Sequence, residues 1–483
     1  MRRNWTVPLF FIATCLTIDI AASQTAERSG PMSAHRESSL IDGAARASAP
    51  TAGGPVGPDV TFCQLFSLQQ FGREGDVVGL SVSTTSWNVG NADLPWFESP
   101  DSRHPFIAQN LYRIKNDRFE QIGQSWLKHG YFALAHVQCG GSCTFEPGHG
   151  SPQWLGMNCT DTYSSFLNSI QGDLGPREEV NPWSGAWTFA GSHNSAMHSH
   201  DDVEHRLQVH DGDLDPAQNA GATYYVEGYY VHYQDVNVMN SAAWKPVSVS
   251  GTPGTTWSFS TSAMGVPPDS GFAVGAWVGA AQTLIAEELP VVEGVSPDGR
   301  SILAAKATEL GGGMWHYDYA LLNIDMDRKI SSFTVPIDPM KTPQNIGFHA
   351  VESHGESYSN DPWTPAVTDD CAIGDRCVAW STVDNPLRWG TVYNFRFDIA
   401  SPPEGGATAS AASGVTAAGG QTLGSAVAIG LFEAGGPATL VAVTVGPALP
   451  APIPAAGFWA IAILTLLLLS AGTIRAGRAV GAD

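Results

Sequence analysis

Positively charged side chains are scarce in this sequence. Lys and Arg number 24 against 46 Asp and Glu, which gives a formal net charge of −22 at pH 7. Such an excess of negative charge repels phosphate backbones, so no nucleic-acid partner is expected. Charged residues of all kinds make up only 14% of the chain, whereas Gly numbers 52, Trp 15 and Tyr 12. This balance is typical of extracellular β-rich proteins rather than of helical cytosolic enzymes.

Few segments show the periodicity of an amphipathic helix. Instead, apolar and polar side chains alternate with a period of two residues. At residues 315–321, large apolar side chains alternate with His316, Asp318 and a small residue, and residues 393–397 alternate in the same way. This pattern is typical of half-buried antiparallel strands.

Two hairpins are predicted from paired apolar segments around turn sequences. Residues 111–114 and 119–122 flank Lys-Asn-Asp-Arg, and residues 427–432 and 439–445 flank a Gly-Gly-Pro turn. Repeated short strands without intervening helices predict an all-β fold with antiparallel β-sandwich architecture, as one large sandwich or two packed ones.

No charged residue interrupts positions 5–15, which lie between a basic start at residues 1–3 and small residues at 21–23. These are the three parts of a secretory signal peptide, so residues 1–23 are predicted to be removed on export. Residues 24–58 contain mainly Ser, Ala, Gly and Pro, a composition that predicts a disordered leader or tether.

A second uncharged stretch lies near the C-terminus, at residues 458–474, and Arg475 and Arg478 follow it directly. With the residues before it, this stretch is long enough to span a bilayer. It predicts one C-terminal transmembrane helix whose arginines stay on the cytoplasmic side.

The segment before this helix, residues 450–455, reads Pro-Ala-Pro-Ile-Pro-Ala. A Pro-rich motif, an apolar helix and a short basic end resemble the C-terminal sorting signals of the PEP-CTERM type, in particular the variants written VPLPA or IPTL. The resemblance covers residues 448–483. It implies an envelope sorting and processing enzyme as a partner, which removes the helix and passes the protein to the cell envelope or outer surface. A plain membrane anchor is the alternative.

The predicted β-rich extracellular region spans residues 59–447, with a flexible loop at 405–420 and, as an alternative to one domain, a split near 240–250. Residues 119–130, 209–216 and 311–317 resemble segments of secreted planctomycete and proteobacterial β-rich proteins. That group has no assigned activity, so the resemblance implies export and no particular chemistry.

Seven cysteines are present, and Cys15 lies in the predicted signal peptide. The even number left in an exported chain predicts disulfides. Cys371 and Cys377 bracket a short polar loop and are predicted to pair. The others, which are expected to form disulfides among themselves, are Cys63, Cys139, Cys143 and Cys159. A metal site that uses Cys139, Cys143, Cys159 and a histidine is the alternative.

Histidines gather between residues 191 and 211, at positions 193, 198, 200, 205 and 210. His198 and His200 would share one face of a strand, and Glu204 would approximate the HxH-x3-E spacing of cupins. The sequence therefore offers His198, His200 and Glu204 as ligands of a transition metal. A solvated histidine-rich loop is the other interpretation.

Three carboxylates follow at alternating positions, Asp211, Asp213 and Asp215. This spacing is similar to the first half of a calcium loop, although the distal Glu of an EF-hand is missing. Calcium is therefore a candidate cofactor, and an Asp-rich turn is the alternative.

No pattern in the chain indicates nucleophilic catalysis. We therefore expect an exported cell-envelope or extracellular-matrix protein with a structural, adhesive or glycan-contacting role, anchored to the membrane at least transiently. Four tryptophans are expected to be exposed because they sit among Gly, Pro, Asn and Ser, and they are candidate platforms for a polysaccharide: Trp87, Trp96, Trp154 and Trp183. The alternative is a secreted metal-dependent enzyme that acts on an extracellular polymer.

Overall fold

The computed structural model describes residues 56–196, 198–261, 266–286, 299–403, 425–433 and 439–449. The predicted signal peptide, the flexible loop at 405–420 and the transmembrane helix at 458–474 lie outside these residues, as do nearly all of the leader and of the sorting signal. Within the described ranges, no helix has both the length and the apolar character needed to cross a membrane.

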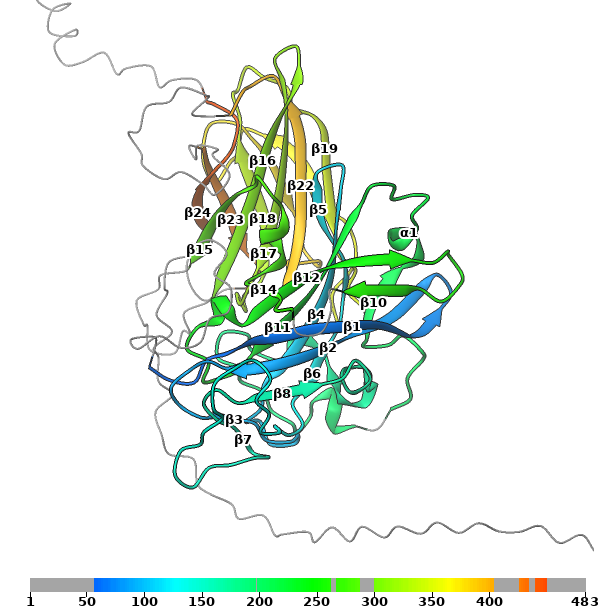
Figure 1. Ribbon diagram of the computed structural model, residues 1–483. Coiled ribbons are helices and arrows are strands. Elements are labelled where there is room, and N and C mark those ends of the chain that lie inside the picture. Colours follow the sequence, from blue (N-terminus) through cyan, green and yellow to red (C-terminus); the bar gives the residue numbers. More distant parts are fainter. Residues whose placement is uncertain are drawn as a thin grey trace, which may run out of the picture. The chain divides into compact units, whose positions relative to one another are not determined.

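The described chain is nearly all β, and its strands form three large sheets in which every neighbouring pair is antiparallel (Figure 1). The order of the main path in the first sheet is β1 (Val60–Glu74), β2 (Val77–Asn88), β10 (Leu207–His210), β5 (Arg118–Gln124), β4 (Phe106–Lys115), β11 (Thr223–Val231), β12 (Ala242–Ser250) and β13 (Ser258–Thr261). Its side branches are β14 (Asp269–Ser270), β6 (Leu127–His129), β8 (Thr160–Tyr163) and β9 (Leu174–Gly175).

The other two large sheets have five strands each. The second contains β15 (Ala281–Ala286), β16 (Arg300–Gly311), β17 (Met314–Asn323), β22 (Thr391–Ile399) and β19 (Gln344–Ala350). The third contains β20 (Thr364–Thr368), β21 (Cys377–Ser381), β18 (Ile330–Pro336), β23 (Ser425–Leu431) and β24 (Thr439–Thr444).

Short elements connect these strands. They are the strand pair β3 (Leu94–Pro95) and β7 (Trp154–Leu155), the α-helix α1 (Asp211–Leu214), and the 3-10 helices η1 (Leu167–Ser169), η2 (Gln171–Asp173), η3 (Arg177–Glu179), η4 (His193–Ser195), η5 (Val238–Asn240) and η6 (Ala273–Ala276).

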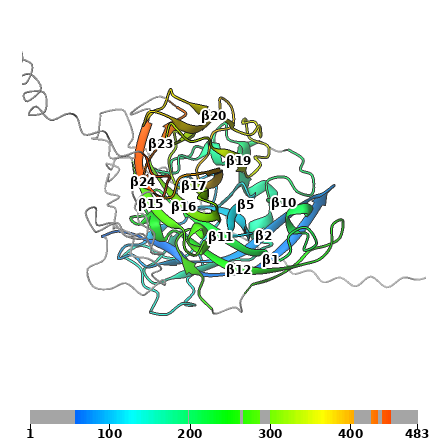
Figure 2. The same cartoon turned by 90° about the horizontal axis from the view of Figure 1, so that it is seen from above.

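The second sheet packs against both other sheets, and each of its faces contributes side chains to a hydrophobic core. Along β17, Tyr319 and Leu321 lie in the core shared with the third sheet, whereas Ala320 and Leu322 lie in the core shared with the first. Figure 2 shows β16 and β17 in this middle position, with β11 and β12 on one side and β23 on the other. The side-chain alternation of a strand therefore supplies two different cores.

The hairpin formed by β4 and β5 connects the first sheet to the second. Asn116 and Asp117 form its two-residue turn, with positive φ angles of 51° and 60°, which suits the right-handed twist of the strands. At the side of β5, the Gln121 side chain accepts a hydrogen bond from the main-chain N–H of Val392, at 2.7 Å. The Asn394 side chain donates to the carbonyl oxygen of Phe119, at 2.6 Å.

A buried arginine holds the same two sheets together. Arg177 is 1% exposed, and its guanidinium donates to the carbonyl oxygens of Ser125 and Gly390 at 2.8 Å and to Asn110 Oδ1 at 2.9 Å. Burial lowers the pKa of Arg177 to about 10, so the group stays charged at neutral pH. Its charge is satisfied by oxygens from several separate segments.

The predicted all-β character and both predicted hairpins are confirmed. The description of 393–397 as half-buried is wrong, because Asn394 is 2% exposed and only Arg396 on this segment is partly exposed. The predicted polar face of β22 packs against the β4–β5 hairpin, and β19 pairs with the edge of β22. The segment near 240–250, where a split was considered, contains β12, which pairs with β11 and β13.

Replacing Phe395 with Ala should destabilise the protein by about 3–5 kcal/mol, the usual cost of removing a buried aromatic ring. Phe395 has no exposed surface, and its ring contacts those of Phe333, Phe348 and Trp363. Urea denaturation of the oxidised protein measures the change. Phe166→Ala is the matched control, since Phe166 is 64% exposed and its loss should cost less than about 0.5 kcal/mol. Equal losses for the two variants would contradict the assignment of this core.

Candidate metal centre

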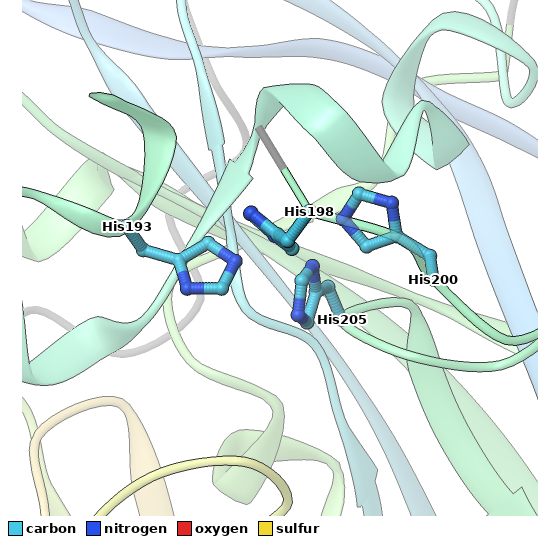
Figure 3. A group of neighbouring side chains, drawn as sticks. All are labelled: His193, His198, His200 and His205. Carbon is cyan, nitrogen blue, oxygen red and sulfur yellow. The ribbon is translucent and has the colours of Figure 1, made fainter. Parts of the chain in front are cut away.

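Four histidines from one irregular segment converge beside the first sheet. His193 begins η4, His198 and His200 lie in the loop after it, and His205 lies in the turn that leads into β10. Figure 3 shows the four side chains gathered at one place. One ring nitrogen of each lies within 4.8 Å of those of the other three.

Trp126 fixes the position of two of these rings. Its indole stacks on the His205 imidazole, with 3.7 Å between ring centroids and 8° between planes, and meets the His193 ring edge-on at 4.7 Å. The Trp126 main-chain N–H donates to the His205 carbonyl oxygen at 2.9 Å. Its indole N–H donates to the carbonyl oxygen of His354 at 2.7 Å. Trp126 is 4% exposed, so the indole is a fixed wall of the cluster.

Hydrogen bonds to main-chain oxygens set the tautomers of two rings. The Nδ1 atom of His198 lies 2.9 Å from the carbonyl oxygen of Ala196, and that of His205 lies 3.4 Å from the carbonyl oxygen of Gln171. A carbonyl oxygen only accepts, so each Nδ1 carries the proton and each Nε2 keeps its lone pair.

The other two rings carry buried nitrogens that lack hydrogen bonds. The Nε2 atoms of His193 and His200 are buried and have no hydrogen-bond partner in the described part of the chain. Leaving a buried polar group unsatisfied costs about 1–3 kcal/mol. A cation bound between the rings would remove this cost.

The surroundings of His193, His200 and His205 favour the neutral form of the imidazole. Burial is the largest cause that lowers the pKa of His193 to about 4 and that of His205 to about 3, and neighbouring imidazoles lower both further. Burial also lowers the pKa of His200. Neutral imidazole is the form that binds a metal ion.

The ligand set selects a class of metal. Imidazole nitrogen suits zinc, copper, nickel and iron, whereas calcium and magnesium prefer oxygen. Four nitrogen ligands would complete the tetrahedral coordination of zinc.

The structure brings His198 and His200 together, with 4.5 Å between their ring centroids, but it directs Glu204 elsewhere. The Glu204 carboxylate accepts a hydrogen bond from the main-chain N–H of Asp201 at 3.1 Å, and Glu204 is not part of the four-histidine group. His193 and His205 take part instead. The density of histidines in the sequence was the available signal for them, but their convergence depends on the path of the loop.

The carboxylates of Asp211, Asp213 and Asp215 do not converge. Asp211 pairs with Arg73 at 2.6 Å and Asp213 pairs with Arg113 at 2.8 Å. Asp215 accepts a main-chain N–H in the turn that follows it, at 2.9 Å. Calcium needs several oxygens around one point. Here each carboxylate faces a different donor.

The six cysteines beyond the predicted signal peptide lie in three pairs at disulfide distances. The Cα–Cα distances are 5.9 Å for Cys63–Cys139, 4.4 Å for Cys143–Cys159 and 6.1 Å for Cys371–Cys377. This pairing uses all three cysteines of the alternative metal site.

The tryptophans considered as glycan platforms are less exposed than expected. The Gly, Pro, Asn and Ser residues that flank them had suggested an exposed position. Trp87 is 4% exposed and Trp96 has no exposed surface, so the expectation that these two are exposed is wrong. Trp154 and Trp183 are partly buried, and each has a ring face against another side chain, His149 and Arg300 respectively.

Acidification should destabilise the metal-free protein through His205. Its pKa is about 3 in the fold and about 6.5 in an unfolded chain, so the unfolded state takes up the proton first. The stability contributed by neutral His205 is complete above pH 6.5 and is lost as pH falls toward 3. We expect the free energy of unfolding, measured by urea denaturation, to fall less between pH 7 and pH 5 in His205→Gln than in the wild type. Parallel losses in the two proteins would contradict the lowered pKa.

The chain matches no protein family and no curated protein sequence.

Proposed function

We propose that this chain is an exported β-sandwich protein of the cell envelope or extracellular matrix that binds a transition-metal ion, zinc or copper, without catalysing a reaction. The observation that carries the proposal is the convergence of four imidazoles, two of which have buried Nε2 atoms without hydrogen bonds in the described part of the chain.

The environment of the rings supports a tight and selective site. The stacking contact with Trp126 and the hydrogen bonds to main-chain oxygens hold the imidazoles in place before any ion arrives. A preorganised site loses little conformational entropy on binding. The neighbouring Glu179 adds a further restraint, because its carboxylate accepts the main-chain N–H of His193 at 2.7 Å.

A set of four histidines favours a structural or metal-holding role over catalysis. Catalytic zinc sites keep a coordination position open for water or substrate, whereas structural sites fill all four positions with protein ligands. The enzyme alternative would need one imidazole to leave the metal and a carboxylate to act as base. Glu204 is instead hydrogen-bonded to the main chain of its own loop.

Replacing His200 with Ala should weaken zinc binding on the order of 100-fold or more, because even loss of a residue that only orients a metal ligand costs about 10–100-fold. Competition against a chromophoric chelator measures the affinity of the chelator-treated protein. His210→Ala is the control: its imidazole lies between Asp76 and Glu352, outside the four-histidine group. Equal affinity in wild type and His200→Ala would exclude this site.

The visible spectrum of the cobalt-substituted protein tests whether the metal has an open coordination position, which a catalytic site would need. Intense visible bands typical of four-coordinate Co²⁺ that do not change on adding azide would support a closed site. Azide-dependent bands would show an open position and would favour the metal-dependent enzyme.

Export to the envelope is supported by two features of the chain. Three cysteine pairs at disulfide distances suit an oxidising compartment. The net charge of −22 suits an extracellular protein that does not bind nucleic acid or anionic membrane surfaces through its folded part. A polysaccharide remains a proposed macromolecular contact, together with the sorting enzyme and, through the predicted C-terminal helix, the membrane.

Deleting residues 448–483 should release the folded protein from the envelope, because both the sorting motif and the predicted transmembrane helix would be lost. Immunoblots of the envelope and medium fractions of the producing cells measure the distribution. A matched variant, Arg475→Gln, keeps the helix and should stay with the envelope. Retention of the truncated protein would contradict the role of this segment.

A further inference from the structure

A second group of metal-binding side chains lies apart from the four histidines. Asp93 directly precedes β3, and Glu146 and His149 lie in the loop that leads to β7. Because β3 and β7 pair as a two-stranded sheet, residues more than fifty positions apart in the chain meet there. One oxygen or nitrogen from each of the three lies within 4.8 Å of those of the other two.

The contacts within this group centre on one carboxylate oxygen. The His149 Nδ1 atom lies 3.1 Å from Asp93 Oδ2 and 3.3 Å from a Glu146 oxygen. The main-chain N–H of Glu146 donates to the same Asp93 oxygen at 2.8 Å.

The other oxygen of Asp93 has no hydrogen bond. The Asp93 side chain has no exposed surface, and its Oδ1 atom is buried without a partner in the described part of the chain. A buried carboxylate is costly unless its charge is paired and its oxygens are satisfied. With Glu146 beside it, the group carries two carboxylates and one imidazole, so a cation is the ligand that its chemistry suits.

The surroundings hold the three side chains in place. The His149 ring stacks on the indole of Trp154, with 3.5 Å between centroids and 9° between planes. The disulfide pair Cys143–Cys159 closes the loop that contains both Glu146 and His149. The loop is therefore fixed at its ends, and Glu146 and His149 lie between them.

We propose that Asp93, Glu146 and His149 form a second metal site, which binds a divalent ion of the zinc class and ties the loop at 143–159 to the strand β3. Two carboxylate oxygens and one imidazole nitrogen suit zinc, whereas calcium prefers oxygen ligands throughout. The ion would neutralise the buried carboxylate and act as a structural cross-link beside the disulfide.

The alternative is that His149 contacts both carboxylates directly, without any ion. The two cases differ in metal content and in the effect of zinc on the loop. They can be separated without any enzymatic assay.

The experiment uses the full-length mature chain with His198→Ala and His200→Ala, which remove two ligands of the four-histidine group. After chelator treatment, the protein is dialysed against zinc in the presence of excess calcium, and bound metal is measured by mass spectrometry. We expect one zinc per chain in this background and at least a tenfold weaker affinity after adding Glu146→Gln. Glu309→Gln, at an exposed position on β16, is the matched control and should keep the zinc.

Limited proteolysis supplies a second measurement, in the same proteins. Zinc should slow cleavage within residues 143–159 in the background protein and should have no effect once Glu146 is changed. His149→Gln is a second variant for use if Glu146→Gln does not fold, as judged by near-ultraviolet circular dichroism. Absence of zinc from the background protein, unchanged affinity in either variant, or calcium in place of zinc would overturn the proposal. Since the four-histidine group is already disabled, these outcomes are independent of the function proposed above.

Discussion

The hydrogen bonds of the buried Arg177 guanidinium hold the first two sheets in their arrangement. The position of the four-histidine cluster depends on the same bonds. It donates to carbonyl oxygens at Ser125 and Gly390, so it joins the end of β5 to the turn before β22. Trp126, the residue after Ser125, carries the indole against His205. Glu179, two residues after Arg177, accepts the N–H of His193. One satisfied charge therefore positions two of the four imidazoles.

The packing of the second sheet between the other two fixes the orientation of the β4–β5 hairpin. A sheet that is covered on one side only would alternate apolar and polar residues. In β17 and β22 most side chains of both faces are buried. Buried polar ones form specific hydrogen bonds, as Asn394 does with the carbonyl oxygen of Phe119. The orientation of the β4–β5 hairpin is fixed by these bonds as well as by apolar contact, because a displaced hairpin would leave buried polar groups unsatisfied.

The two proposed metal sites share structural features. In each, an indole stacks on an imidazole, Trp126 on His205 and Trp154 on His149, and limits its rotation. In each, a buried atom that could bind a cation has no hydrogen bond: Nε2 of His193 and of His200 in the first, Oδ1 of Asp93 in the second. They differ in donors, four nitrogens against one nitrogen and two oxygens, and so should differ in affinity and in metal preference.

The sequence by itself determined the all-β character, the antiparallel hairpins and the richness in histidine of residues 191–211, because period-two alternation, turn residues and composition are local properties. Only the tertiary structure decided that Trp87 and Trp96 are buried, that Asp211 and Asp213 pair with arginines, and that His193 and His205 rather than Glu204 join His198 and His200. It also decided that Asp93 meets Glu146 and His149. Each of these outcomes depends on contacts between segments far apart in the chain or on the path of an irregular loop. Local patterns carry little information about either, since no hydrophobic period specifies where a loop turns.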